Sequence, residues 1–208
     1  MKLIVLGPQG SGKGTQAELL AKHFMVLHID AGRMLRDESN KNSDLGKKIR
    51  AHIDKGELIR DEIMLNILEV RLKKRDCKAG FVLDGFPRTV NQAKKFHAKN
   101  AVNKVVFLRI NNSLAVKRLS KRLQCSKCGS IYGVEIMPKK SGICDDCGGK
   151  LFQRVDDKPE IIRKRLKIYH KQARPIIAFY KKQRLFVDFD GSKSINFVFK
   201  KILHSLKK

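Results

Sequence analysis

The sequence contains no tryptophan and only three tyrosines among its 208 residues. Proteins that bind single-stranded nucleic acid stack bases on aromatic side chains, so this shortage argues against a nucleic-acid-binding protein. No run approaches the roughly 18 apolar residues of a membrane span, and the apolar run 3–6 is far too short for the core of a signal peptide. We therefore expect a cytoplasmic protein, in which thiols stay reduced and paired cysteines indicate a metal site.

Acidic residues are also scarce. The chain has 20 Asp and Glu against 46 Lys and Arg, which gives a formal net charge of +26. Such a protein attracts anions, but charge alone does not choose among nucleotides, nucleic acid and acidic membrane surfaces. A length of 208 residues suits one compact domain with small insertions, and we expect a monomer.

Short runs rich in Val, Ile, Leu or Phe alternate with longer helical stretches, which predicts an α/β fold. The five predicted strands are 2–6, 26–29, 81–84, 105–110 and 186–189. Strands that are apolar on both faces are typical of a parallel sheet covered by helices on both sides, here a doubly wound sheet. Ligands of such folds bind beyond the carboxyl ends of the strands, so the residues just after each strand are candidates for a site.

Two segments interrupt this alternation. Residues 30–60 are polar with helical spacing, and residues 121–157 contain four cysteines, several glycines and little helical periodicity. Both are predicted to be insertions over the binding edge of the sheet. The remaining residues, 1–29, 61–120 and 158–208, form the predicted core.

A glycine-rich loop follows the first predicted strand. Residues 7–15 read GPQGSGKGT, in which two glycines separated by four residues precede a lysine, the spacing of phosphate-binding loops. In such loops the backbone amides and the N-terminus of the next helix face the phosphates, and the lysine adds a mobile charge. The sequence departs from the motif at Gly14, which precedes Thr15. The predicted phosphate-binding residues are Gly10, Ser11, Gly12, Lys13, Gly14 and Thr15.

Three long motifs carry a family resemblance: GPQGSGKGT at 7–15, DGFPRT at 84–89 and QRVDDKPEIIRKRL at 153–166. In this order, and over nearly the whole chain, they resemble adenylate kinases of the long-lid type. The resemblance implies a phosphate-loop α/β fold with an AMP-binding insertion at 30–60 and a lid at 121–157. It also implies magnesium-dependent, reversible transfer of the ATP γ-phosphoryl group to AMP, which gives two ADP.

The resemblance assigns the transferring group to a cluster of charged side chains. The implied catalytic residues are Lys13, Asp84, Arg88, Arg122, Arg154 and Arg165. Asp84 ends a predicted strand beside the phosphate loop, where a carboxylate can hold the water shell of magnesium. Arg118 and Arg122 are four residues apart on a predicted helix, so their like charges need an anion between them, which a triphosphate supplies. Further implied contacts of ATP are Ile131, Tyr132 and the backbone near Lys193.

The same resemblance implies an acceptor site. Its implied AMP-binding residues are Ala31, Arg36, Glu57, Leu58, Ile59, Gly85, Phe86, Pro87, Arg88, Gln92, Arg154 and Arg165. The family usually has Thr or Ser in place of Ala31 and Asp in place of Arg33, so this chain loses a hydroxyl and reverses a charge. These departures leave the acceptor base open, and a kinase for UMP, CMP or GMP is the nearest alternative. Gln92, which contacts adenine in the family, and the cysteine-containing lid favour AMP.

Four cysteines stand in two Cys-x-x-Cys pairs, a spacing typical of structural zinc sites. The pairs are Cys125 with Cys128 and Cys144 with Cys147. Four thiolates complete a tetrahedral shell and leave no open position for substrate, so we expect a structural site. A lid with few apolar residues has too little core to hold its shape, and metal binding supplies folding free energy instead. Disulfides, free thiols and iron are the alternatives to zinc.

Two other classes of protein remain as alternatives. A basic zinc-containing RNA-binding protein would use the charge and the cysteine module, and tight RNA binding without nucleotide turnover would identify it. A phosphate-loop ATPase would drive a partner protein, and phosphate release without AMP would identify it. The acceptor-side residues Arg36, Arg88 and Gln92 would then have no purpose. We expect ATP, AMP and ADP as ligands, and nucleic-acid binding only as an incidental affinity of the basic surface.

Overall fold

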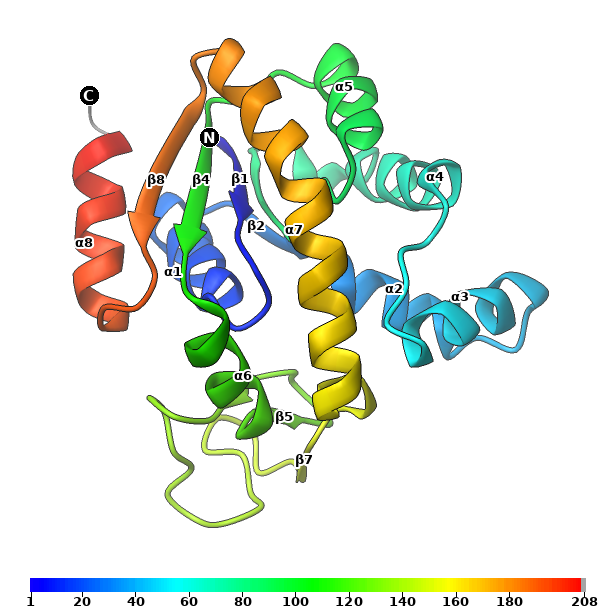
Figure 1. Ribbon diagram of the computed structural model, residues 1–208, viewed down its shortest axis with the longest axis vertical. Helices are drawn as coiled ribbons and strands as arrows, with labels where there is room; N and C mark the ends of the chain where they lie inside the picture. The colour runs from blue at the N-terminus through cyan, green and yellow to red at the C-terminus, as the bar shows by residue number, and fades with distance from the viewer. Residues whose placement is uncertain (207–208) are drawn as a thin grey trace.

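The computed structural model describes residues 1–206, and its centre is a five-stranded parallel sheet (Figure 1). The strands lie in the order β2-β3-β1-β4-β8. Their bounds are β1 (Lys2–Leu6), β2 (Leu27–Asp30), β3 (Phe81–Asp84), β4 (Lys104–Arg109) and β8 (Phe186–Asp190). Every strand end lies within one residue of its predicted position. The prediction of a doubly wound α/β fold is therefore confirmed.

Helices cover both faces of this sheet (Figure 1). On β1, Leu3 and Val5 pack with α1 and α8 on one face, whereas Ile4 and Leu6 pack on the other face with α2, α4, α5 and α7. Side chains alternate along a strand, so a strand buried on both faces is apolar at every position. The helix bounds are α1 (Lys13–Phe24), α2 (Ala31–Ser39), α3 (Asp44–Asp54), α4 (Asp61–Leu72), the 3-10 turn η1 (Arg75–Cys77), α5 (Val90–Lys99), α6 (Asn112–Ser120), α7 (Pro159–Lys182) and α8 (Ile195–Leu206).

The polar segment after β2 forms helices α2 and α3. The side chain of Asp30 caps α2 by accepting a hydrogen bond from Arg33 N at 3.0 Å, and Ser43 Oγ caps α3 by accepting one from Gly46 N at 3.0 Å. Each cap satisfies a backbone donor that has no partner inside the helix. These caps, together with a few buried residues on each helix, stabilise α2 and α3, which is why the segment is helical despite its polarity.

The cysteine-containing segment folds as a small antiparallel sheet with the order β6-β5-β7. Its strands are β5 (Leu123–Cys125), β6 (Ile131–Tyr132) and β7 (Leu151–Phe152). The sequence did not predict these strands, because two or three residues are too few to show an alternating pattern. The buried core of this sheet consists of Cys125, Tyr132, Cys144 and Leu151. Two of these four residues are cysteines, which agrees with a lid that has little apolar core.

Helix α7 runs from the lid past α6 to α5 (Figure 1). Its first helical residue is Pro159, a position where proline is favoured because the N–H group would have no partner there. The lid end of α7 carries Arg165, and its other half buries Ile176 and Tyr180 in the core. Within residues 1–206, no helix combines the length and apolarity that crossing a bilayer requires.

Candidate active site

The glycine-rich loop leads from β1 directly into α1, as the motif predicts. Gly10 and Gly12 have φ values of 81° and 84°, a left-handed conformation that residues with a Cβ rarely adopt. A Cβ at Gly10 would also lie 2.8 Å from the carbonyl oxygen of Ala115 on α6. The loop therefore needs glycine at these positions to wrap closely in front of the N-terminus of α1, where anions bind favourably.

Two pockets meet at this loop. We call the first the donor pocket, and the predicted ATP-binding residues that line it are Gly10, Gly12, Lys13, Gly14, Thr15, Arg118, Arg122, Ile131 and Tyr132. We call the second the acceptor pocket, and the predicted residues that line it are Lys13, Arg36, Glu57, Leu58, Gly85, Pro87, Arg88, Arg154 and Arg165. Lys13 lines both. The two predicted nucleotide sites thus adjoin at one cationic side chain.

Asp84 is buried near Lys13, the residue that lines both pockets. Burial lowers the pKa of Lys13 to about 8, against the opposing influence of Asp84. Burial also raises the pKa of Asp84 to about 6, against the opposing influence of Lys13. Asp84 Oδ1 is buried and has no hydrogen-bond partner among the described residues. A buried, unpaired carboxylate oxygen beside a phosphate loop fits the hydration shell of a magnesium ion.

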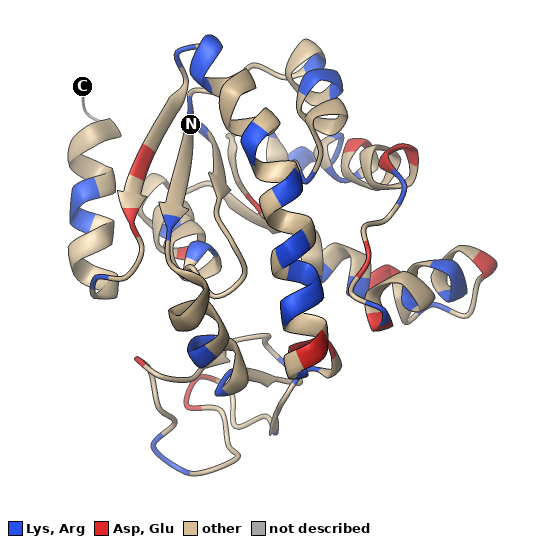
Figure 2. Cartoon of the chain, in the orientation of Figure 1, with Lys and Arg blue, Asp and Glu red and all other residues tan. Residues whose placement is uncertain are grey.

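A second cluster joins the lid to α7. Arg154, just before the 3-10 turn η2 (Val155–Asp157), donates from Nε and Nη2 to Asp156 at 2.8 and 2.6 Å. Arg165 Nη1, from α7, lies 2.9 Å from Asp156 Oδ2 and 3.6 Å from Asp157 Oδ1. Although burial disfavours its charged form, Asp156 has a pKa far below its usual range because Arg165 and Arg154 adjoin it. Lys and Arg residues also continue along the rest of α7 (Figure 2).

Arg118 and Arg122 are arranged differently from the prediction. Helix α6 ends at Ser120, so Arg122 lies beyond the helix rather than one turn along it. Each arginine has its own carboxylate partner: Arg118 pairs with Glu135 of the lid, and Arg122 pairs with Asp157. Arg118 Nη1 also donates to the carbonyl oxygen of Gly191 at 2.7 Å. The prediction that both arginines stand on one helix is therefore wrong, because α6 ends before Arg122. Both still line the donor pocket, so their predicted contact with a triphosphate stays a prediction.

Some predicted site residues lie behind the pocket walls. In the part of the chain that the structure describes, seven of them line neither pocket: Ser11, Ala31, Ile59, Asp84, Phe86, Gln92 and Lys193. Phe86 is fully buried in the core, and its ring meets that of Phe96 edge-on. Gln92 supports the turn before it, because its Oε1 accepts from Arg88 N at 2.8 Å and its Nε2 donates to Asp61 Oδ1 at 2.8 Å.

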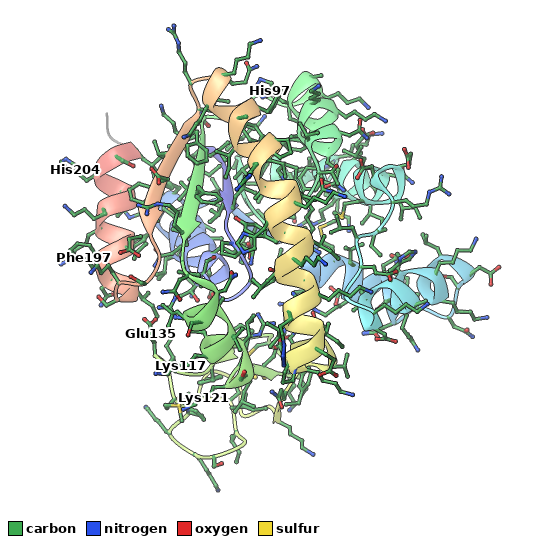
Figure 3. All side chains as sticks on the ribbon, viewed as in Figure 1. His97, Lys117, Lys121, Glu135, Phe197 and His204 are labelled. Atoms are coloured by element: carbon green, nitrogen blue, oxygen red, sulfur yellow. The ribbon has the colours of Figure 1, made fainter. Side chains whose placement is uncertain are left out.

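Three carboxylates with structural roles at the site escaped the sequence analysis. Asp61 accepts hydrogen bonds from Thr89, Asn91 and Gln92, which fixes the start of α5. Asp30 caps α2 and also lies 3.4 Å from Arg36 Nη2. Glu135 projects from the lid near α6, where it meets Arg118 (Figure 3). Of these three residues, only Asp30 could have been identified from the sequence, because it directly follows the predicted strand 26–29 at the binding edge of the sheet.

The four lid cysteines converge on one point. Their Sγ atoms all lie within 4.8 Å of one another, and two of the pairs are 3.4 and 3.5 Å apart. A tetrahedral zinc ion with Zn–S bonds of about 2.3 Å separates its sulfur ligands by roughly 3.8 Å. All four cysteines are free rather than joined in disulfides. The thiol groups therefore fit a closed metal site of four sulfur ligands.

Comparisons with known proteins agree with this geometry. The family model described as adenylate kinase matches residues 5–185. Proteins named adenylate kinase from Caldicellulosiruptor saccharolyticus and Syntrophotalea carbinolica are 43% and 44% identical to this chain, covering 99% of it and 99% and 98% of their own lengths. The adenylate kinase of Archaeoglobus fulgidus is 40% identical over 100% of this chain and 99% of its own. The match spans both pockets and the lid, and this chain belongs to the adenylate kinase family.

Proposed function

We propose that this chain catalyses the reversible transfer of the γ-phosphoryl group of ATP to AMP, which gives two ADP. The observation that carries the proposal is the pair of pockets that adjoin at Lys13. A phosphate-loop ATPase needs a site for one nucleotide only, whereas this chain has a second pocket lined by Arg36, Arg88, Arg154 and Arg165. Membership of the adenylate kinase family supports the same activity.

The donor pocket is proposed to hold ATP. The backbone amides of the phosphate loop and the N-terminus of α1 would face the phosphates, with Lys13 and Thr15 beside them. Arg118 is tied to the loop, because its Nη1 lies 3.3 Å from the carbonyl oxygen of Gly10. Ile131 and Tyr132 would cover the nucleotide from the lid, and the backbone near Lys193 would meet the adenine.

The acceptor pocket is proposed to hold AMP. Arg36 and Arg88 would bind the phosphate, with Glu57 and Leu58 lining the side toward the base. Burial lowers the pKa of Arg36 to about 10, partly offset by Asp30, yet the guanidinium stays charged at neutral pH. Ala31, Ile59, Phe86 and Gln92 would act from behind the wall by holding its shape. A bound anion is favoured there because it relieves the repulsion among buried cations.

Arg122, Arg154 and Arg165, all paired with Asp156 or Asp157, are proposed to neutralise the charge of the transferring group. Each guanidinium has five N–H donors, and Arg122 and Arg154 each direct Nε and Nη2 to a carboxylate. Asp156 and Asp157 thereby fix the orientation of these arginines while leaving Nη1 for phosphate oxygens. Phosphoryl transfer requires positioning and charge neutralisation more than covalent chemistry, so no protein base is needed: the nucleophile is an ionised oxygen of AMP.

Two metal ions complete the proposal. Magnesium, arriving with ATP, supplies charge neutralisation at the donor phosphates, and Asp84 would hold its water shell. Zinc would be bound by Cys125, Cys128, Cys144 and Cys147 and would have a purely structural role, because four thiolates leave no open position. Zinc is favoured over iron by its preference for such closed structural sites.

We further propose that residues 30–60 form the AMP-binding insertion and residues 121–157 a lid, both carried by the core of residues 1–29, 61–120 and 158–208. Closure of the lid would exclude water and so favour transfer over hydrolysis. We place the protein in the cytoplasm, because cysteines that are free of disulfides suit a reducing compartment, and we propose that it is a monomer.

The identity of the nucleoside monophosphate that accepts the phosphoryl group can be tested directly. ATP with each of AMP, UMP, CMP and GMP in a coupled assay for ADP should give the highest kcat/KM with AMP. The variant Ala31→Thr should keep that preference, since Ala31 is 1% exposed and lies behind the wall. A higher kcat/KM for UMP, CMP or GMP would contradict the assignment to AMP, and phosphate release from ATP without any acceptor would favour an ATPase.

A further inference from the structure

Arg33 joins the AMP-binding insertion to the metal site of the lid. Its Nη1 donates a hydrogen bond to the backbone carbonyl oxygen of Cys128 at 3.1 Å, across 95 positions of sequence. Arg33 belongs to α2, whereas Cys128 is one of the four converging cysteines. In residues 1–206, Arg33 lines neither nucleotide pocket. The contact therefore holds two segments together rather than binding a phosphate.

The lid is shaped to receive this guanidinium. Gly129, the residue after Cys128, has a φ of 81°, which favours glycine. A Cβ built at Gly129 would lie 2.8 Å from Arg33 Nη1 and 3.3 Å from its Cζ. The same turn is fixed from the lid side, because Gly129 N donates to the carbonyl oxygen of Cys125 at 3.1 Å. The position of the acceptor carbonyl thus depends on the turn between two metal-ligating cysteines.

Within the AMP-binding insertion, hydrogen bonds also fix the position of Arg33. The backbone N–H of Arg33 donates to Asp30 Oδ1 at 3.0 Å, and Asp30 Oδ2 lies 3.4 Å from Arg36 Nη2. Arg33 and Arg36 are three residues apart on α2, and Arg36 lines the acceptor pocket. A bond from Arg33 to the lid therefore fixes the helix that carries Arg36. Arg154, which lines the same pocket, follows the lid strand β7.

We infer that Arg33 is a positioning residue that connects the metal-bound turn of the lid to the wall of the acceptor pocket, so that an ordered metal site favours the closed arrangement. This inference rests on the proposed function. A bound metal ion would fix the turn that carries the Cys128 carbonyl, this carbonyl accepts the hydrogen bond of Arg33, and Arg33 would hold α2 with Arg36 in the acceptor pocket. An uncharged side chain of similar length, as in Arg33→Met, cannot donate this bond, whereas Arg33→Lys keeps one charged donor.

The test measures by titration calorimetry the affinity for a bisubstrate analogue in which five phosphates join two adenosines. It uses the parent protein, Arg33→Met, Arg33→Lys and Lys164→Met, each in metal-loaded and metal-stripped form, with metal content measured directly. Lys164 is the matched control, because its Nζ also contacts the insertion, at Glu57 Oε1 2.9 Å away, but from α7 rather than from the lid. Binding, rather than turnover, is the readout.

We expect metal-loaded Arg33→Met to bind the analogue about fivefold more weakly than the parent, as loss of one charge-assisted hydrogen bond implies, with unchanged metal content. Arg33→Lys should recover part of this loss. Stripping the metal should weaken the parent and Lys164→Met by the same factor, and Arg33→Met by a clearly smaller one, because its connection to the metal site is already broken.

Two results would overturn the inference. One is parental affinity in metal-loaded Arg33→Met. The other is an equal effect of metal removal on the parent and on Arg33→Met, which would make the two changes independent. A parent protein that fails to bind the analogue at all would instead contradict the proposed function, so the two failures are distinguishable.

Discussion

Arg122 and Asp157 form a bidentate salt bridge, in which Arg122 Nε donates to Asp157 Oδ2 at 2.8 Å and Arg122 Nη2 donates to Asp157 Oδ1 at 2.5 Å. The Asp157 side chain is fully buried and that of Arg122 is 17% exposed. Planar guanidinium and carboxylate groups that meet in this way fix each other's orientation. An arginine of the donor pocket is thus held in place by the protein itself, before any nucleotide binds.

Removing the negative charge of Asp157 should therefore lower both the stability of the fold and the rate of catalysis. Asp157→Asn keeps the shape but leaves a mostly buried arginine without its counter-ion, which costs about 3 kcal/mol and about 6–12 °C in Tm. We also expect kcat to fall about tenfold, because Arg122 loses its fixed orientation. Thermal unfolding and initial rates measure the two effects.

An exposed pair of the same type provides the control. Arg109 Nε lies 2.6 Å from Asp188 Oδ2, but the two side chains are 59% and 46% exposed. Asp188→Asn should cost less than about 1 kcal/mol and leave kcat unchanged. Equal losses of stability in the two variants would show that burial of Asp157 has no special importance.

Lys13 is the residue shared by both pockets, and its charge should be indispensable. We expect Lys13→Met to lower kcat by at least about a thousandfold, since it removes a preorganised charge from the transferring group, while circular dichroism stays unchanged. Lys22→Met on the same helix, where Lys22 forms an exposed pair with Glu18, should behave as the parent. Parental activity in Lys13→Met would refute the assignment.

The lowered pKa of Lys13 predicts a proton uptake on nucleotide binding. Because this pKa is about 8 in the free protein, Lys13 is mostly neutral at pH 9. Phosphates favour the charged form and raise the pKa, so binding at pH 9 takes up a proton and affinity falls as pH rises above 8. Calorimetry of a non-hydrolysable ATP analogue in two buffers with different ionisation enthalpies measures the uptake. The same uptake in Lys13→Met would assign it to another group.

Metal removal should unfold the lid locally. We expect loss of the ion to lower Tm by roughly 5–10 °C and to raise KM for ATP, because the lid core of Cys125, Tyr132, Cys144 and Leu151 is too small to hold its shape alone. Cys144→Ser should reproduce both effects. Cys77→Ala, a buried cysteine outside the lid, should keep the metal. A stripped protein with unchanged Tm and KM would contradict a structural metal.

The sequence predicts the sheet well because its central strands β1, β3 and β4 are buried on both faces. Leu3, Ile4 and Val5 are 0% exposed. A short apolar run that ends at a glycine and alternates with longer helical patterns is typical of a buried parallel strand. The phosphate loop and the cysteine pairs are equally predictable from the sequence. A loop whose backbone lies close to phosphates requires glycines at fixed positions, and a four-cysteine metal site requires fixed spacings between its cysteines. The lid strands were not predicted, because strands of two or three residues carry no periodic pattern.

The pairings within the site were largely beyond sequence analysis. Asp156 and Asp157 stand just before Pro159 in the sequence, a pattern typical of a helix start, yet their side chains hold Arg122, Arg154 and Arg165. A carboxylate at a helix start is most often a cap or a solvated charge, and only the fold brings it to a distant arginine. Asp61 and Glu135 escaped notice for the same reason: their partners lie on other elements.

The central claim is that two nucleotides meet at Lys13 and exchange one phosphoryl group directly. The most direct measurement is incubation of metal-loaded protein with ADP and magnesium alone, followed by separation of the nucleotides over time. We predict ATP and AMP in equal amounts, and the same final mixture when the reaction starts from ATP plus AMP. An ADP solution that stays unchanged, or ATP that yields ADP and free phosphate without consuming AMP, would contradict the account.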